Sequence, residues 1–262
     1  MINKPMIGVA AAVVVIAAGG WYYLHNRHVE VAQVVAQAPP PAASDEAAIE
    51  HPLPSGADSA TGAPLPTLAD SDAPLIDALV KIAGASAVKD YLLPDSVIRH
   101  LVVTIDNLPR QKVAVQKRPI GPVSGPFVAD GDELHATLDA QNYARYEAMV
   151  AIAGKLDVQQ LTALYVRFYP LFQQAYQDLG YPNGYFNDRL VQVIDNLLAT
   201  PQPVGPIGLT RPNVMYIFAD PALESRSAGQ KLLMRMGPKN AGTIKTKLKE
   251  LRAAIAAAPP KR

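Results

Sequence analysis

The chain has 262 residues and no cysteine, and 49% of its residues are hydrophobic. Without thiolate ligands a structural zinc site is not expected, and disulfide bonds are excluded. The net charge of +1 conceals an asymmetry: residues 28–80 hold eight acidic side chains and no Lys or Arg, whereas residues 225–262 hold ten Lys or Arg and one Glu. Either the two ends attract one another, or the basic end meets an anionic partner.

Residues 1–28 are predicted to form a membrane anchor. The run from Ile7 to Leu24 has 18 residues without Lys, Arg, Asp, Glu or Pro. As a helix it would be about 27 Å long, close to the thickness of a bilayer's hydrocarbon core. A cleaved signal peptide ending near Gly20 is the alternative. The acidic stretch that follows favours a short inner tail and a translocated C-terminal domain.

Residues 29–67 are predicted to be a Pro/Ala-rich, acidic, disordered linker. Seven prolines stand there among Ala, Ser, Gly and acidic residues, and large apolar side chains are sparse. Such a segment buries too little surface to offset its ordering entropy. It would hold the following domain away from the membrane.

Residues 68–258 are predicted to form one helical domain, followed by a tail at 259–262. Their apolar spacing fits a period of 3.6 residues better than alternation. The pattern predicts seven helices, which open at Asp72, Asp95, about Asp139, Asp157, about Asn187, Ser227 and Gly242. Val214–Phe218 is the strongest strand candidate, and Phe127–Val128 is a weaker one. The predicted fold class is therefore mostly α, a helical bundle with at most a short β-ribbon.

Several helix signals are local and specific. Asp157 with Gln160 and Ser227 with Gln230 have the spacing of N-terminal caps. Pro170 is expected to kink the fourth helix, and Gly180 is placed to end it.

An internal duplication is predicted, with pseudo-repeats at about 95–153 and 184–257. Residues 101–108 and 190–197 agree at six of eight positions. Further matches follow in the same order, namely Pro119-Ile120-Gly121 with Pro206-Ile207-Gly208, Ala129-Asp130 with Ala219-Asp220, and Arg145 with Arg235. Four matches in one order indicate a repeated unit.

The repeat also predicts a polar centre. Asp106 and Asp195 fall near helix C-termini, where the macrodipole disfavours negative charge. A guanidinium group binds a carboxylate in a forked geometry. We therefore expect Asp106 and Asp195 to pair with Arg145 and Arg235, in one of the two combinations. The centre would either serve binding or only hold loops in place.

Four longer motifs occur together in this chain, namely Ile105-Asp106-Asn107-Leu108-Pro109, Asn142-Tyr143-x-Arg145-Tyr146, Phe218-Ala219-Asp220-Pro221-x-Leu223-Glu224 and Gln230-Lys231-x-Leu233-x-Arg235-Met236-Gly237-Pro238-x-Asn240. With these motifs the chain resembles the uncharacterised bacterial membrane-anchored family known as domain-of-unknown-function family 3014. The resemblance covers about Leu68 to Leu251 and implies a single N-terminal membrane helix with an envelope-facing helical domain, but no activity. It therefore implies a bacterial inner-membrane protein with a periplasmic domain.

Two function classes and a minor third remain open. The first is a non-enzymatic interaction or scaffolding module that binds a protein partner in the envelope, with Lys231, Arg235 and Asn240 lining a polar groove. The second is an envelope hydrolase or transferase that uses acids such as Asp220 and Glu224; a helix-capping role for both would argue against it. The third is binding of anionic lipid or glycan by the basic face of the last helix, Lys245, Lys247, Lys249 and Arg252.

No catalytic, metal-binding or cofactor-binding residue is predicted. The sequence has no P-loop, nucleophile elbow or dinucleotide fingerprint. Its five histidines form no recognisable ligand set, and no basic patch with interleaved aromatic residues indicates nucleic-acid binding.

Overall fold

The computed structural model describes residues 48–53, 64–132, 135–212 and 215–256. The predicted membrane anchor, most of the predicted linker and the C-terminal tail lie outside these residues. Within these ranges no helix combines the length and the apolar character that crossing a bilayer requires.

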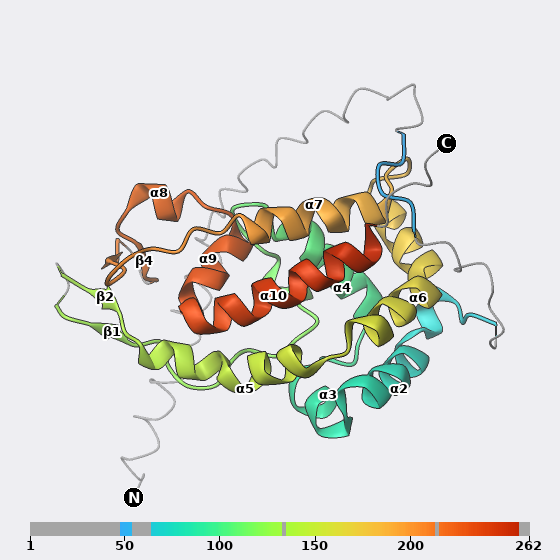
Figure 1. The fold of residues 1–262 in the computed structure, drawn as a ribbon, viewed down its shortest axis with the longest axis horizontal. Helices are drawn as coiled ribbons and strands as arrows, with labels where there is room; N and C mark the ends of the chain where they lie inside the picture. The colour runs from blue at the N-terminus through green and yellow to red at the C-terminus, as the bar shows by residue number, and fades with distance from the viewer. Residues whose placement is uncertain (1–47, 54–63, 133–134, 213–214, 257–262) are drawn as a thin grey trace, which may run out of the picture. The chain divides into compact units, whose positions relative to one another are not determined.

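The described residues are mostly helical, as the sequence predicts (Figure 1). The α-helices are α2 (Asp72–Ala83), α3 (Ala85–Tyr91), α4 (Val97–Asn107), α5 (Gln141–Lys155), α6 (Val158–Asp178), α7 (Phe186–Leu198), α8 (Pro221–Glu224), α9 (Ala228–Arg235) and α10 (Pro238–Ile255). Two short 3-10 helices, η1 (Leu68–Asp70) and η2 (Val115–Lys117), and four short strands, β1 (Ala129–Asp130), β2 (Thr137–Leu138), β3 (Leu209–Thr210) and β4 (Ile217–Phe218), complete the description.

Two of the predicted caps are confirmed. The Asp157 carboxylate accepts the amide hydrogen of Gln160 at 3.0 Å, and the Ser227 hydroxyl accepts that of Gln230 at 3.2 Å. Helix α6 contains Pro170 and ends two residues before Gly180, whose φ of 113° requires a residue without a Cβ atom. Local sequence therefore sets these helix ends.

Other helix starts differ from the prediction. Asp72 does not cap α2; its carboxylate instead accepts the amide hydrogens of Ser96 and Val97, at 2.7 and 2.8 Å, and so caps α4. Helix α10 begins at Pro238, earlier than the predicted Gly242, because Gly237 turns the chain with φ 81° and Pro238 suits a first helical turn.

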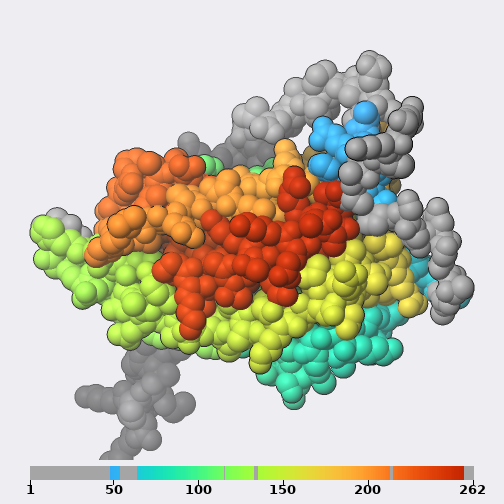
Figure 2. Space-filling model, in the orientation of Figure 1, coloured from blue at the N-terminus to red at the C-terminus, as the bar shows by residue number. Residues whose placement is uncertain are grey.

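The helices pack in two main groups. Helix α10 contacts α5 and α7, and α4 contacts α6; Figure 2 shows the surface of α10 in red between that of α7 in orange and that of α5 in yellow-green. An aromatic core around α6 contains Phe168, Phe172 and Phe186, with the Phe172 and Phe186 rings stacked 5.8 Å apart. A second core, which includes Val193 and Leu233, lies where α7 and α9 meet α5 and α10.

Two hairpins meet beside this second core. Strand β1 pairs with β2, and β3 pairs with β4, each in the antiparallel sense. An antiparallel bridge between Thr137 and Gly208 joins β2 to β3. The strand predicted at 214–218 is shorter in the structure, and the one predicted at 127–128 lies two residues later.

Part of the predicted linker is packed against the domain. The backbone amide of His51 donates to Asp188 at 2.6 Å, and its carbonyl accepts from the Asn187 side chain at 2.8 Å. Leu53 and Leu65 pack against the aromatic core. Residues 48–53 and 64–67 of the predicted linker thus contact the domain, and Asn187 and Asp188 of α7 supply hydrogen-bond partners for the backbone of Glu50 and His51.

Candidate functional site

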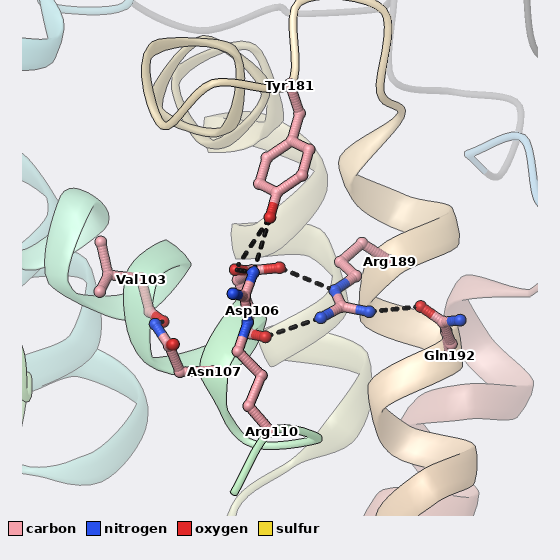
Figure 3. Close-up of polar contacts among 7 residues, drawn as sticks. All are labelled: Val103, Asp106, Asn107, Arg110, Tyr181, Arg189 and Gln192. Carbon is pink, nitrogen blue, oxygen red and sulfur yellow. Dashed lines mark hydrogen bonds and ion pairs between the residues drawn. The ribbon is translucent and has the colours of Figure 1, made fainter. Parts of the chain in front are cut away.

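The most buried charged side chain among the described residues is Asp106, at the C-terminal end of α4, with 3% of its surface exposed. Figure 3 shows the groups that surround it. Arg189 of α7 donates through Nε to the carboxylate at 2.9 Å. Arg110 donates through Nη2 to the other carboxylate oxygen at 2.7 Å, and the same nitrogen donates to the Tyr181 hydroxyl at 2.7 Å. The centre therefore joins α4, α7 and the loop after α6.

Two cations compensate one buried anion in this centre. Arg189 also donates through Nη2 to the backbone carbonyl of Asp106 at 2.7 Å. That carbonyl belongs to the last turn of α4, where helix carbonyls lack internal partners. Burial lowers the pKa of the Arg110 guanidinium, but the attraction of Asp106 and Tyr181 outweighs burial and leaves that pKa above its ordinary value. These hydrogen bonds hold the guanidinium groups of Arg110 and Arg189 beside the Asp106 carboxylate.

Tyr181 is held in the centre by an aromatic contact. Its ring stacks on that of Tyr176 at 4.6 Å between centroids, and burial raises the pKa of Tyr176 to about 12. The Tyr176 phenol therefore stays neutral at physiological pH.

The predicted pairing of Asp106 and Asp195 with Arg145 and Arg235 is wrong. Asp106 pairs with Arg110 and Arg189, and Asp195 pairs with Arg252 of α10. The prediction failed because α7 and α10 pack directly on the elements that carry these carboxylates, which the repeat spacing does not reveal.

Arg145 and Arg235 bind backbone instead. Arg145 donates to the carbonyl of Ser124 at 3.0 Å, and Arg235 donates to that of Tyr216 at 3.2 Å. The Arg235 guanidinium also lies over the Phe218 ring, 5.1 Å from its centroid. Both arginines thus hold loop segments that precede the two Ala-Asp pairs.

Two of the three residues predicted to line a polar groove, Lys231 and Asn240, are engaged within the domain. Lys231 is bound by the Glu224 carboxylate at 2.7 Å, and only 13% of its side chain is exposed. Asn240 is buried and donates to the carbonyls of Tyr143 and Met236, each at 2.9 Å. Asn240 is therefore a structural link between α5 and α10.

The basic face of α10 is partly neutralised within the protein. Lys245 donates to the carbonyl of Thr200 at 2.6 Å, Lys247 pairs with Glu250 at 2.9 Å, and Arg252 pairs with Asp195. Lys249 is exposed. Fewer charges are available to an anionic surface than the sequence suggests.

The acids named for an enzyme have structural partners. Asp220 is the N-cap of α8 and accepts the amide hydrogen of Ala222 at 2.8 Å, with Pro221 in the first turn. Glu224 binds Lys231 and accepts the amide hydrogen of Phe218 at 3.0 Å. No group of three or more His, Asp or Glu side chains suited to a metal ion occurs among the residues described.

Sequence reasoning missed Arg189, Arg110 and Tyr181. Arg110 stands four residues after Asp106, a spacing that permits an ion pair on a helix. Arg189 and Tyr181 lie 83 and 75 residues away from Asp106 in the chain, and no local pattern connects them to it.

An apolar groove is open on the surface between α2, α3 and α5. It has a volume of about 230 Å³, and apolar atoms line nearly all of it. Ala83, Ala87 and Val88 form one side, and Met149, Ile152 and Ala153 form the other.

The described residues thus define a mostly helical domain with a buried carboxylate centre that joins its helices. Residues 97–252 match the model of a family described as a protein of unknown function, DUF3014, and the chain belongs to this family. Neither the curated proteins nor the solved structures include a significant match to the chain.

Proposed function

We propose that this chain is a non-enzymatic interaction protein of the bacterial cell envelope, anchored by residues 1–28, whose domain binds an apolar helix of a protein partner. The single observation that carries the proposal is the groove between α2, α3 and α5. Apolar surface of this kind, left open between helices, is how helix-binding proteins receive a partner helix.

The shape of the groove supports a helix as the occupant. Its sides are themselves helices, and Ala83, Ala87 and Ala153 are small residues that allow a partner helix to approach closely. Ile120 lines the same groove with 40% of its surface exposed. Covering these side chains would remove apolar surface from water.

The state of the acidic groups supports a binding role over catalysis. Asp220 caps a helix, Glu224 is held by Lys231, and Asp106 is held by two arginines. A general acid or base needs a proton that it exchanges with a substrate, and each of these carboxylates already accepts structural hydrogen bonds.

The location is inferred from the N-terminal sequence. The 18-residue apolar run is long enough to span a bilayer, and the acidic stretch behind it has no positive charge to retain it in the cytoplasm. The duplication predicted from the sequence would give the domain two related surfaces. A reporter fused after Arg262 that is active only in the periplasm tests the location, and activity of a cytoplasm-specific reporter would overturn it.

Site-specific photo-crosslinking in cells tests the groove. A photoreactive residue at Ala87 is expected to give a discrete crosslink to another protein, whereas one at Thr246 on α10 is not. Ala153→Glu places a charge in the groove and should abolish the Ala87 crosslink.

Ala151→Glu provides the matched control, because Ala151 is exposed on the same helix outside the groove and should leave the crosslink intact. Crosslinks only to a second copy of the chain, or only to lipid, would overturn the proposed partner class. Equal crosslinking from Ala87 and Thr246 would show that the groove has no role.

A further inference from the structure

A second cavity, of about 220 Å³, lies at the N-terminal end of α10. It is bounded by the segment after α7, by the turn between α9 and α10, and by Tyr143 of α5. The Tyr143 ring lies so close to Gly237 that a Cβ atom there would be 2.5 Å from it. The tyrosine therefore forms a fixed wall.

The cavity is apolar on most of its surface and has one cationic group. Ile207, Leu233, Met234 and Pro238 contribute apolar walls. Lys245 also lines it, one turn beyond the buried Ala241 on α10. A concave apolar site with a few polar groups is the usual form of a small-ligand pocket.

Lys245 has unused capacity to bind an anion. An ammonium group has three donors, and the carbonyl of Thr200 accepts one of them at 2.6 Å. None of the ion pairs between described residues includes Lys245. Burial lowers the pKa of this ammonium group, and the charge of Lys249 adds to the effect. A carboxylate beside Lys245 would favour its charged form and so offset both effects.

We propose that this cavity binds a small carboxylate with an apolar body, whose carboxylate contacts Lys245 and whose apolar part contacts Leu233 and Met234. The cavity is smaller than the usual range for drug-sized ligands, about 300–1,000 Å³, so the ligand is a short branched or linear acid. The site is separate from the groove between α2, α3 and α5, and neither proposal depends on the other.

Methionine methyl NMR of the full-length chain tests the site with isocaproate as the probe. Met234 lines this cavity, and Met149 lines the other groove. We expect isocaproate to shift the Met234 signal in a saturable way and to leave Met149 unchanged. The neutral isostere isocaproamide should bind about tenfold more weakly or not at all, because it loses the charge-assisted hydrogen bond.

Two variants complete the test. Lys245→Gln should weaken isocaproate binding by about tenfold or more, whereas Lys249→Gln, outside the lining, should not. If Lys245→Gln does not fold, the test of the proposal is the comparison of isocaproate with isocaproamide binding to the wild-type chain. Equal binding of acid and amide, unchanged binding by a folded Lys245→Gln, parallel shifts of Met234 and Met149, or no saturable shift of Met234 would each overturn the proposal.

Discussion

Arg189 of α7 binds Asp106 of α4 twice, at the carboxylate over 2.9 Å and at the backbone carbonyl over 2.7 Å. One guanidinium therefore neutralises a buried charge and also satisfies a carbonyl at a helix end. This contact links α4 and α7, the two helices that carry the matching Ile-Asp-Asn-Leu motifs. Of the two motif aspartates, Asp106 takes part in the contact and Asp195 does not.

Arg189→Ala is expected to destabilise the domain by about 3 kcal/mol, because it leaves the buried Asp106 with the half-exposed Arg110 and the Tyr181 hydroxyl as its remaining side-chain partners. Urea unfolding of the variant measures the change. Arg99→Ala is the control, since the Arg99–Asp178 pair is exposed and should contribute at most about 1 kcal/mol. Equal losses in the two variants would show that the buried centre does not stabilise the fold.

Gly237→Ala is expected to destabilise the domain, whereas Gly242→Ala should stabilise it by up to about 1 kcal/mol. Gly237 has φ 81° and faces the Tyr143 ring, so an added methyl group meets both backbone strain and a collision. Gly242 lies inside α10, and a Cβ atom there would have no neighbour within 4 Å. Thermal unfolding of both variants decides the matter; shifts of the melting temperature in the same direction would contradict this account of the α9–α10 turn.

The Glu224–Lys231 pair is expected to make stability depend on pH. Burial by itself would raise the pKa of Glu224, but hydrogen bonds from Lys231 and from the Phe218 amide outweigh burial, and the pKa is lowered. Because the pKa of Glu224 is lowered in the folded state, the ionised carboxylate stabilises the fold at pH values above the ordinary carboxyl pKa of about 4.3. This stabilisation is lost as the pH falls through the lowered pKa of the folded state.

Glu224→Gln should therefore reduce the free energy of unfolding at neutral pH by about 1 kcal/mol, with the difference shrinking in acid. Urea unfolding from neutral pH to below about pH 3 measures it. Lys231→Met removes the cationic partner of Glu224 and should likewise make the free energy of unfolding less dependent on pH in this range. A difference that persists unchanged in acid would argue that the carboxylate charge is not its cause.

Asp188→Ala is expected to release residues 48–53 locally. The Asp188 carboxylate accepts the amide hydrogens of Glu50 and His51, at 3.2 and 2.6 Å. Without these acceptors the two amides should exchange with solvent about tenfold faster. Hydrogen exchange with fragment analysis measures this, and Asp178→Ala serves as the control because Asp178 pairs with Arg99 elsewhere. Unchanged exchange at Glu50 and His51 would mean that other contacts hold the segment.

The sequence alone determined the mostly helical character and several helix ends. The caps at Asp157 and Ser227 each involve a side chain and an amide three residues later, so the information is complete within one turn of chain. The family was also recognisable from short motifs, and the match over residues 97–252 confirms it. The predicted duplication stays a prediction.

Only the tertiary structure decided the partners of charged and buried groups. Asp106 binds Arg189 rather than Arg145, Asp72 caps α4 rather than α2, and Asn240 lies buried between helices rather than in an open groove. Each of these contacts depends on which helix faces pack together, and that packing is set by apolar surface summed over many residues. No spacing within a single segment encodes it, so the helical periodicity and the caps at Asp157 and Ser227 were predicted correctly while the long-range partners of Asp72 and Asp106 were not.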